Sequence, residues 1–271
     1  MNPENYLARI AYSGALAPTH ATLAALCAHH IAAIPFENID VLLDRPIDIS
    51  AAAVETKLVT QKRGGYCFEH NGLFKRVLAA LGFEVESLAA RVLWRAQEDD
   101  APRPRTHSAL RVHLDGRAWL VDVGFGGWVP PAPLALADRE PQAIGNETFR
   151  IRPAAGADAV VIETLLDGVW RSLYELSPEP LLDVDYQPLN WFTSTYPSSI
   201  FRQDLMAAIT TPQARYMLMN GRLTIRGRDG AGERRELDAA GLENVLADIF
   251  GLPVQASWRP LLQRLCYAAG K

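Results

Sequence analysis

A cysteine, a histidine and an aspartate stand in sequence contexts that would let them act as a nucleophile, its base and an orienting acid. The cysteine, Cys67, follows two glycines in the stretch RGGYCFEHN, residues 63–71, and begins a helical pattern. The first turn of a helix carries unpaired backbone N–H groups and a partial positive charge, which stabilise a thiolate. The sequence therefore predicts an exposed, reactive thiol at Cys67, although an isolated cysteine is more often buried and structural.

The helix that would present this thiol is predicted from apolar residues at the spacing of one helical face: Leu73, Phe74, Val77, Leu78 and Leu81. It is expected to end at Gly82, because glycine suits the left-handed residue that follows a helix. Gly64 and Gly65 lack a Cβ, so the chain can turn sharply before Cys67. The same glycines would let a ligand approach the backbone closely.

The histidine and the aspartate lie on what the sequence predicts to be one hairpin. A strand pattern from residue 107 to 125 is interrupted by an Asp-Gly pair at 115–116, which is a typical two-residue turn. Such a turn pairs positions whose numbers sum to 231, so Asp122 lies opposite Ala109. His107 shares a face with Ala109, which makes His107 and Asp122 diagonal neighbours, roughly 7–8 Å apart. Their side chains can hydrogen-bond, whereas a one-residue slip would put them on opposite faces.

A carboxylate bonded to one imidazole nitrogen fixes the ring's orientation and leaves the other nitrogen to exchange a proton with a thiol. Asp122, His107 and Cys67 supply these three groups. His107 could instead be a surface residue and Asp122 a strand-end residue bonded to backbone. An acid inside the apolar run WLVDVGF is costly without a partner, however, which favours the pair. The contact between Cys67 and the hairpin does not follow from the sequence.

These residues lie in blocks that resemble the arylamine N-acetyltransferases. The blocks occur in that family's order and spacing, and the resemblance covers nearly the whole chain, more loosely toward its C-terminal end. They are IPFENID at 34–40, RGGYCFEHN at 63–71, THSALRV at 106–112, VDVGFGG at 121–127 and STYPSSIF at 194–201. The family's Cys-His-Asp triad falls on Cys67, His107 and Asp122 with no substitution.

The resemblance implies ping-pong transfer of an acetyl group. The Cys67 thiolate would attack the acetyl carbonyl of acetyl-CoA, CoA would leave, and an amine would then attack the acetyl-cysteine. Acetyl-CoA is thus expected as a co-substrate, without a metal, and a small aromatic amine or hydrazine as the acceptor. Backbone N–H groups around Cys67 are the expected donors to the tetrahedral intermediates, and the sequence does not identify a second donor.

The resemblance also implies substrate contacts. Three aromatic positions match those that line the family's acceptor pocket: Phe36, Phe125 and Phe201. Thr106 stands at a position that the family places near CoA, and Gly126 and Gly127 follow the strand end, where they could admit the pantetheine arm close to the backbone. Each ring could equally be ordinary core, and the glycines a plain turn. Glu37 and Arg63 resemble a buried ion pair of the family, which would brace the loop before Cys67 without reacting.

Other interpretations of the motifs are weaker. Cys67 and His70 have a C-x-x-H spacing, but the chain has no second such pair and no C-x-x-C, which argues against a zinc site. Cys27 and Cys266 have no acid–base partner in their neighbourhood and are interpreted as structural thiols. The GFGG sequence lacks the spacing of a dinucleotide-binding loop.

Three other functions use the same features. A papain-like hydrolase or transglutaminase would use the same trio without CoA. An amide synthase that closes a ring from a carrier-bound acyl chain would need a longer acyl donor. A non-catalytic binding module could keep the fold, but an intact trio argues against it. Turnover of acetyl-CoA that requires an arylamine separates the acetyltransferase from the hydrolase. Genomic neighbourhood would reveal the amide synthase, and a binding module would bind CoA without acetylation of Cys67.

Composition limits the class of protein. The chain has 271 residues, of which 49% are hydrophobic, and a net charge of −4. These values exclude a disordered chain and argue against general nucleic-acid binding. Three cysteines are too few for a disulfide framework and fit a reducing compartment. We expect a cytoplasmic protein without a membrane anchor, because no basic leader and no long apolar run are found.

The pattern of elements changes twice along the chain. Residues 1–82 indicate helices, residues 83–195 indicate strands with hairpin turns, and residues 196–271 mix both types. This order predicts an α+β fold. The resemblance implies the same layout: an N-terminal helical bundle with the nucleophile, a central antiparallel barrel-like domain with His107 and Asp122, and a C-terminal α/β lid. The core would be cysteine-protease-like, with the site where the first two parts meet.

Overall fold

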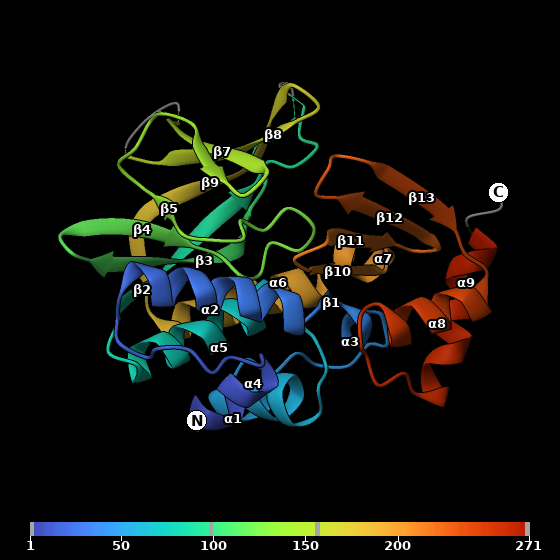
Figure 1. Ribbon diagram of the computed structural model, residues 1–271. Helices are drawn as coiled ribbons and strands as arrows, with labels where there is room; N and C mark the ends of the chain where they lie inside the picture. The colour runs from blue at the N-terminus through green and yellow to red at the C-terminus, as the bar shows by residue number, and fades with distance from the viewer. Residues whose placement is uncertain (1–2, 98–99, 155–157, 269–271) are drawn as a thin grey trace.

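The computed structural model describes residues 3–97, 100–154 and 158–268. Its N-terminal part is helical, as the sequence predicts. The helices of this part are α1 (Pro3–Arg9), α2 (His20–Ala33), α3 (Ile39–Leu42), α4 (Ala51–Glu55) and α5 (Cys67–Ala80), and a π-helical turn, η1 (Thr56–Thr60), continues α4. Figure 1 shows α2 and α5 lying along the strands β2 to β4, which places the start of α5 beneath the sheet.

Helix α5 begins and ends where its sequence indicates. Its apolar face is completely buried, since Leu73, Phe74, Val77 and Leu78 are all 0% exposed. Gly82 follows the last turn with φ of +88°, a left-handed value that glycine adopts without strain. The helix is therefore anchored along its length by the core between the helices and the sheet, and this fixes its first residue, Cys67.

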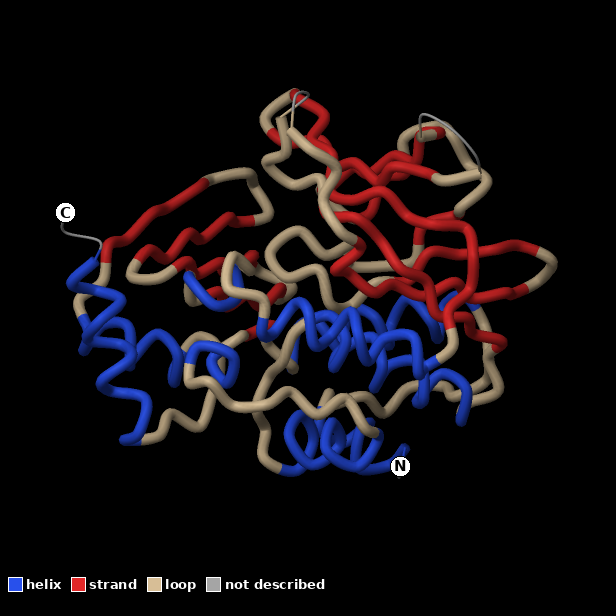
Figure 2. The backbone as a smooth tube through the Cα atoms, turned by 180° about the vertical axis from the view of Figure 1, so that it is seen from behind, coloured by secondary structure: helices blue, strands red, loops and turns tan. Residues whose placement is uncertain are grey.

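The central part is an antiparallel sheet whose strand order is β5-β4-β3-β2-β9-β8-β7-β6. Its strands are β2 (Glu84–Val92), β3 (Arg105–Leu114), β4 (Arg117–Val121), β5 (Leu134–Ala135), β6 (Gln142–Ile144), β7 (Glu147–Pro153), β8 (Val160–Leu166) and β9 (Val169–Leu181). Figure 2 shows this sheet curling strongly above the helices. The curl encloses a second core, which includes Phe149, Leu173 and Tyr174.

The β3–β4 hairpin has the predicted register. Leu110 pairs with Val121 and Leu114 with Arg117, so the paired numbers sum to 231. The turn residues Asp115 and Gly116 have φ of +52° and +71°, as a type I′ turn requires. Strand β4 is shorter than predicted, however, because it ends at Val121 rather than near residue 125.

The C-terminal part contains a smaller antiparallel sheet with the order β1-β10-β11-β12-β13. Its elements are β1 (Phe36–Glu37), β10 (Met206–Thr210), β11 (Ala214–Met219), β12 (Arg222–Gly227) and β13 (Gly232–Glu236), with α8 (Ala239–Asp248), η3 (Ala256–Trp258) and α9 (Arg259–Ala268) packed beside them. The edge strand β1 comes from the N-terminal part. Between the two sheets run η2 (Asp183–Asp185), α6 (Tyr186–Thr195) and α7 (Ile200–Gln203).

The predicted α+β fold with helical, barrel-like and mixed parts is confirmed (Figure 1). Because β1 joins the C-terminal sheet, the parts share an element instead of following one another along the chain. The boundaries expected near residues 82 and 195 stay predictions. Within the described ranges, none of the helices combines the length and the apolar composition needed to cross a membrane.

Candidate active site

The loop before Cys67 is held tightly from both sides. The Tyr66 backbone N–H donates to Glu69 Oε2 at 3.0 Å, so a side chain of the first turn caps the start of α5. A Cβ at Gly64 would collide with the Pro35 carbonyl oxygen, and one at Gly65 would collide with the Glu69 carboxylate. Both glycines are therefore required for the backbone to pass between these groups.

Cys67 itself is more enclosed than the sequence suggests. It is only 3% exposed, so the expectation of an exposed thiol is wrong. The cause is the segment after β4, which closes over the start of α5: a Cβ at Gly124 would lie 2.8 Å from the Cys67 Cα. The thiol Sγ contacts the Thr106 carbonyl oxygen at 3.7 Å. The nucleophile candidate thus lies at the junction of α5, β3 and the segment that follows β4.

His107 and Asp122 form the pair that the hairpin register predicts. His107 Nε2 lies 2.7 Å from Asp122 Oδ2, and the residues are 3% and 2% exposed. Because Nε2 is bound to the carboxylate, Nδ1 is the nitrogen left for the thiol. The Cys67 sulfur lies close enough to the ring to help raise the pKa of His107. The structure therefore brings the three predicted side chains into one connected set.

Asp122 is positioned by groups on both sides of the site. Its Oδ1 accepts hydrogen bonds from Asn71 Nδ2 at 3.0 Å and from the Gly124 backbone N–H at 2.9 Å. Asn71 Oδ1 accepts from the Val123 N–H at 3.1 Å. These bonds bend the chain away from the sheet, which explains why β4 stops at Val121. They also leave Oδ2 directed at His107.

The electrostatics favour a charged histidine. Burial lowers the pKa of His107, but the Asp122 carboxylate and the Cys67 sulfur outweigh burial and raise that pKa to about 10. Burial raises the pKa of Asp122, whereas His107, Asn71 and the Gly124 N–H more than offset it, so the net change is downward. At neutral pH the pair is an imidazolium bonded to a carboxylate.

The three predicted acceptor-pocket rings lie around this centre. The Phe125 ring meets the His107 ring edge-on, with centroids 5.1 Å apart. The Phe36 and Phe201 rings lie 6.2 Å apart, and Phe201 also contacts Tyr66, the residue before the cysteine, at 5.5 Å. Phe36, Phe201 and Tyr66 share an apolar cluster with Cys67, and the half-buried Phe125 packs against the two neighbouring cores, so apolar rings lie beside the sulfur and beside His107.

Of the three positions predicted near CoA, Thr106 lies at the sulfur, whereas Gly126 and Gly127 pack against Phe36 and Met217. The Thr106 carbonyl faces the sulfur. Gly126 has φ of +79°, and a Cβ there would lie 3.5 Å from the Phe36 ring. A Cβ at Gly127 would collide with the Met217 side chain. These two glycines therefore let the segment run closely between Phe36 and β11.

Behind the nucleophile loop lies a buried ionic network that includes the Glu37–Arg63 pair implied by the sequence resemblance. Arg63 Nη2 lies 2.7 Å from Glu37 Oε1 and 3.2 Å from Asp40 Oδ2. Lys57 connects Asp40 at 3.0 Å to Glu69 at 2.7 Å. The carboxylate that caps α5 is thus neutralised by Lys57, a partner that no sequence motif indicates.

Sequence reasoning also missed the roles of two residues of the site. Asn71 belongs to the cysteine motif and lies one helical turn after Cys67, a spacing that could have indicated a shared face. Ser108 donates from Oγ to the Cys67 carbonyl at 2.9 Å, which ties β3 to the helix. His70 does not point to Cys67 as a C-x-x-H site would require, because it bonds to His30 at 2.8 Å. Among the described residues, no group of three or more His, Cys, Asp or Glu is arranged to hold a metal ion.

Comparison with known proteins identifies relatives over most of the chain. A family model described as N-acetyltransferase matches residues 19–259. The arylamine N-acetyltransferase of Mycobacterium tuberculosis (strain ATCC 25618 / H37Rv) is 40% identical over 252 residues, which cover 92% of this chain and 88% of the relative. That of Escherichia coli (strain K12) is 39% identical, with the same coverage.

Solved structures agree with this similarity. The structure of Mycobacterium marinum arylamine N-acetyltransferase superposes with a TM-score of 0.93 at 40% identity, and the match covers 98% of this chain and 100% of that one. The structure of the same organism's enzyme in complex with CoA has a TM-score of 0.91 at 41% identity, and covers 98% of both chains.

Proposed function

The chain belongs to the arylamine N-acetyltransferase family, and from this premise we propose that it moves the acetyl group of acetyl-CoA to an arylamine or arylhydrazine through an acetyl-Cys67 intermediate. The observation that supports this most directly is the connected set of Cys67, His107 and Asp122. A sulfur beside an imidazolium that a buried carboxylate orients has the arrangement of an activated nucleophile.

In the first half-reaction, the Cys67 thiolate attacks the carbonyl carbon of the acetyl thioester. A new C–S bond forms, the bond to the CoA sulfur breaks, and His107 Nδ1 gives its proton to the departing thiolate. Attack passes through a tetrahedral intermediate with a negative oxygen. The first backbone N–H groups of α5, which have no carbonyl partner within the helix, are our candidate donors to that oxygen.

In the second half-reaction, the amine nitrogen attacks the acetyl-Cys67 carbonyl. His107 is now neutral, so its Nδ1 takes the proton that the amine loses, and Cys67 leaves as a thiolate. This restores the starting charges, because the imidazolium and the thiolate form together. Asp122 keeps its negative charge throughout and stabilises the imidazolium at both ends of the cycle.

The surrounding residues suggest where each substrate binds. We assign Phe36, Phe125 and Phe201 to the acceptor, because an apolar wall beside the sulfur suits a flat aromatic ring. We assign Thr106, Gly126 and Gly127 to the pantetheine arm, because the Thr106 carbonyl faces the Cys67 sulfur and the two glycines closely follow Gly124, which packs against Cys67. Cys27, Cys67 and Cys266 are all free thiols, which supports a reducing, cytoplasmic location.

Intact mass spectrometry after mixing the protein with acetyl-CoA alone tests the proposal. We expect one added acetyl group on the wild type and none on Cys67→Ala. Cys266→Ala removes a half-buried thiol outside the site and is the matched control, which should acetylate like the wild type. Adding aniline should then remove the label and yield acetanilide.

Two results would contradict the mechanism. Acetylation of the Cys67→Ala variant at the wild-type rate would show that another group is the nucleophile. Rapid loss of the acetyl group in water without an amine would indicate a hydrolase instead of a transferase.

A further inference from the structure

Three buried side chains, Tyr6, His30 and His70, form a line of hydrogen bonds through the N-terminal helices, here called the histidine chain. The Tyr6 hydroxyl on α1 lies 2.8 Å from His30 Nδ1 on α2, and His30 Nε2 lies 2.8 Å from His70 Nδ1 on α5. His70 Nε2 in turn lies 3.2 Å from the Pro35 carbonyl oxygen. The three side chains are 0%, 0% and 1% exposed. The mechanism proposed above uses none of them.

Chemistry fixes the direction of each bond in the histidine chain. A carbonyl oxygen only accepts, so His70 Nε2 carries a hydrogen and donates to Pro35. Burial lowers the pKa of both histidines, that of His70 to about 4, so both rings are neutral at neutral pH. His70 Nδ1 is therefore an acceptor, which makes His30 Nε2 its donor and leaves His30 Nδ1 to accept from the Tyr6 hydroxyl. Removing any link leaves a buried polar atom without its partner.

The histidine chain ends at the residue that precedes Phe36, Pro35. On the other side of Phe36, the Glu37 backbone N–H donates to the Gly65 carbonyl at 2.7 Å. The Phe36 ring runs nearly parallel to the His70 ring, with 23° between the planes and the centroids 6.4 Å apart. The backbone and the ring of Phe36 are therefore both set by contacts with α5 and with the loop before it.

Other groups hold the nucleophile and its partners. The hydrogen bonds to Asp122 come from Asn71 and from the Gly124 N–H. Ser108 holds the Cys67 carbonyl. None of these bonds passes through the histidine chain. Loss of the histidine chain should therefore displace Phe36 and leave the activation of the thiol intact.

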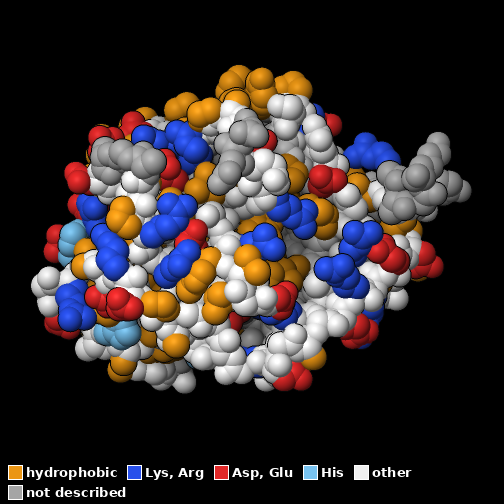
Figure 3. All heavy atoms as spheres, turned by 90° about the horizontal axis from the view of Figure 1, so that it is seen from above, with side chains coloured by type: hydrophobic (Ala, Val, Ile, Leu, Met, Phe, Trp, Pro, Cys, Tyr) orange, Lys and Arg blue, Asp and Glu red, His pale blue; other side chains and the backbone are white. Residues whose placement is uncertain are grey.

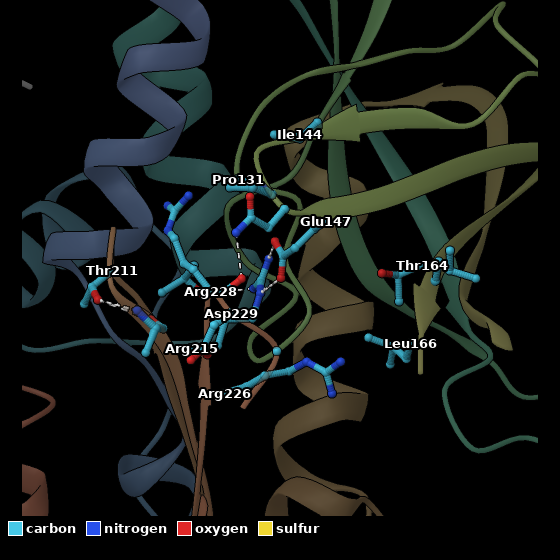
Figure 4. Close-up of a pocket in the computed structure, with 16 residues that line it drawn as sticks. Pro131, Ile144, Glu147, Thr164, Leu166, Thr211, Arg215, Arg226, Arg228 and Asp229 are labelled. Carbon is cyan, nitrogen blue, oxygen red and sulfur yellow. Dashed lines mark hydrogen bonds and ion pairs between the residues drawn. The ribbon is translucent and has the colours of Figure 1, made fainter. Parts of the chain in front are cut away.

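The histidine chain lies away from the pocket between the two sheets. Figure 4 shows this pocket, which has a volume of about 210 Å³ and includes the Arg215–Glu147 pair. Its walls belong to the sheets at the top of Figure 1, and Figure 3 shows Lys and Arg side chains near the middle of this upper face. The histidine chain lies in the helices below the sheets, and none of its three side chains lines the pocket. We therefore interpret it as acting through packing, not by binding a ligand.

We propose that the histidine chain positions the Phe36 ring for aromatic acceptors and thereby sets the affinity of the acetylated protein for arylamines. This rests on the proposed function, in which Phe36 contacts the acceptor. Tyr6, His30 and His70 are positioning residues, since they act through Pro35 and Phe36 without touching the reacting atoms. An acceptor that has no ring gains nothing from the Phe36 ring, so its transfer should not depend on the histidine chain.

Two acceptors and two half-reactions separate this role from general support of the fold. The protein is first acetylated with acetyl-CoA, and loss of the acetyl group is then followed by intact mass with aniline, which has a ring, or with hydrazine, which has none. For His70→Leu we expect the half-saturating aniline concentration to rise about tenfold, because Pro35 and His30 each lose a hydrogen-bond partner. The limiting rate, the transfer to hydrazine and the first acetylation should keep their wild-type values.

Conservative variants and a matched control identify the hydrogen bonds as the cause. His70→Gln keeps an amide N–H for Pro35 and an oxygen for His30, so it should restore the aniline affinity to within about twofold. Tyr6→Phe removes only the first donor and should raise the half-saturating aniline concentration about threefold. It decides the question if His70→Leu does not fold. Tyr12→Phe removes a hydroxyl outside the histidine chain, whose exposed hydrogen bond of 2.6 Å goes to a backbone carbonyl, and should change nothing.

The possible results are distinct. Equal losses with aniline and hydrazine, or slower acetylation by acetyl-CoA, in a folded His70→Leu or Tyr6→Phe variant would overturn the proposal, because the histidine chain would then support the whole site. Unchanged aniline affinity in Tyr6→Phe would also overturn it, as would a His70→Gln variant no better than His70→Leu. A wild-type protein that acetyl-CoA does not acetylate would instead refute the proposed function, and this proposal with it.

Nitrogen-15 NMR of histidine-labelled protein tests the direction of the hydrogen bonds. In the wild type at neutral pH, His30 and His70 should each carry one ring hydrogen, on Nε2. Tyr6→Phe should shift the His30 Nδ1 resonance, because that nitrogen loses its donor, whereas Tyr12→Phe should not. A hydrogen on Nδ1 of either histidine would overturn the assigned histidine chain.

Discussion

Replacing Asp122 by asparagine changes one oxygen of the site to an amide nitrogen and nearly preserves its shape. Oδ1 can still accept from Asn71 and from the Gly124 N–H, which keeps the side chain in its present orientation. The new amide NH₂ then faces His107 Nε2, where the carboxylate oxygen was. An amide NH₂ donates a hydrogen bond and cannot accept one, so His107 Nε2 must become the acceptor. The neutral ring then carries its proton on Nδ1, toward the sulfur.

The size of the effect follows from the pKa of His107. Asp122 contributes the largest of the influences that raise this pKa to about 10 from the ordinary 6.5. Losing the whole difference corresponds to roughly 5 kcal/mol, since one pH unit is worth about 1.4 kcal/mol. A free energy of this size would make the imidazolium–thiolate pair rarer, relative to the neutral pair, by about 10³-fold. We therefore expect Asp122→Asn to slow acetylation of Cys67 by about 10³-fold.

Rapid mixing with acetyl-CoA, followed by intact mass measurement over a range of pH, gives the acetylation rate directly. In the wild type, His107 stays protonated up to its raised pKa, so the rate should hold through neutral pH and fall near pH 10. In Asp122→Asn this decline should move to neutral pH or below. The shift of the alkaline limit distinguishes an electrostatic role for Asp122 from a purely structural one.

The chain provides a matched control next to the same hairpin, with His113 on β3 and Glu86 on the neighbouring strand β2. His113 Nε2 lies 2.9 Å from Glu86 Oε2, and both side chains are about one-third exposed. Glu86→Gln makes the same chemical change beside a histidine outside the site, so acetylation should not change. If Asp122→Asn acetylated at the wild-type rate with the wild-type pH limit, the carboxylate would have no electrostatic role in activating the thiol.

Three further outcomes are expected. The raised pKa of His107 stabilises the folded state fully below pH 6.5, and this stabilisation is lost as the pH rises through about 10. The free energy of unfolding in urea should therefore fall between these two pH values in the wild type. It should not fall there in Asp122→Asn. Glu69→Gln leaves Lys57 with one buried carboxylate less and should lower the free energy of unfolding by about 3 kcal/mol; an unchanged urea midpoint would contradict this. Asn71→Ala removes a donor to Asp122 and should slow acetylation about tenfold in the same mass assay, and no slowing would show that Asp122 needs no such support.

The site could be anticipated from the sequence where local chemistry determines geometry. An Asp-Gly turn requires positive φ at both residues, so it sets the register of β3 and β4, and the register brings His107 beside Asp122. In the same way, the glycines and apolar spacing around Cys67 determine where α5 begins. The resemblance to a known family supplied the remaining site positions.

What the sequence could not provide depends on packing between distant segments. The burial of Cys67 results from the turn at Gly124, which Asn71 holds across a separation of 52 residues. Arg215 contacts Gly127 across a separation of 88 residues, and no motif indicates that contact. Lys57 has no recognisable pattern around it, yet it connects two buried carboxylates. Such contacts follow from the assembled fold and leave no local signal.

Strand β1 comes from the N-terminal part but pairs in the C-terminal sheet, so the N-terminal and central parts cannot be separated from the C-terminal part without loss of contacts. Phe36 and Glu37 pair with Ala208 and Ala207, and the Arg63 guanidinium lies 4.7 Å from the centre of the Trp258 ring. A fragment cut after the large sheet would leave β1 without its strand partner and Arg63 without its aromatic cover. The nucleophile loop would lose support at both places. The C-terminal part of the chain therefore helps to hold the reactive sulfur in its position.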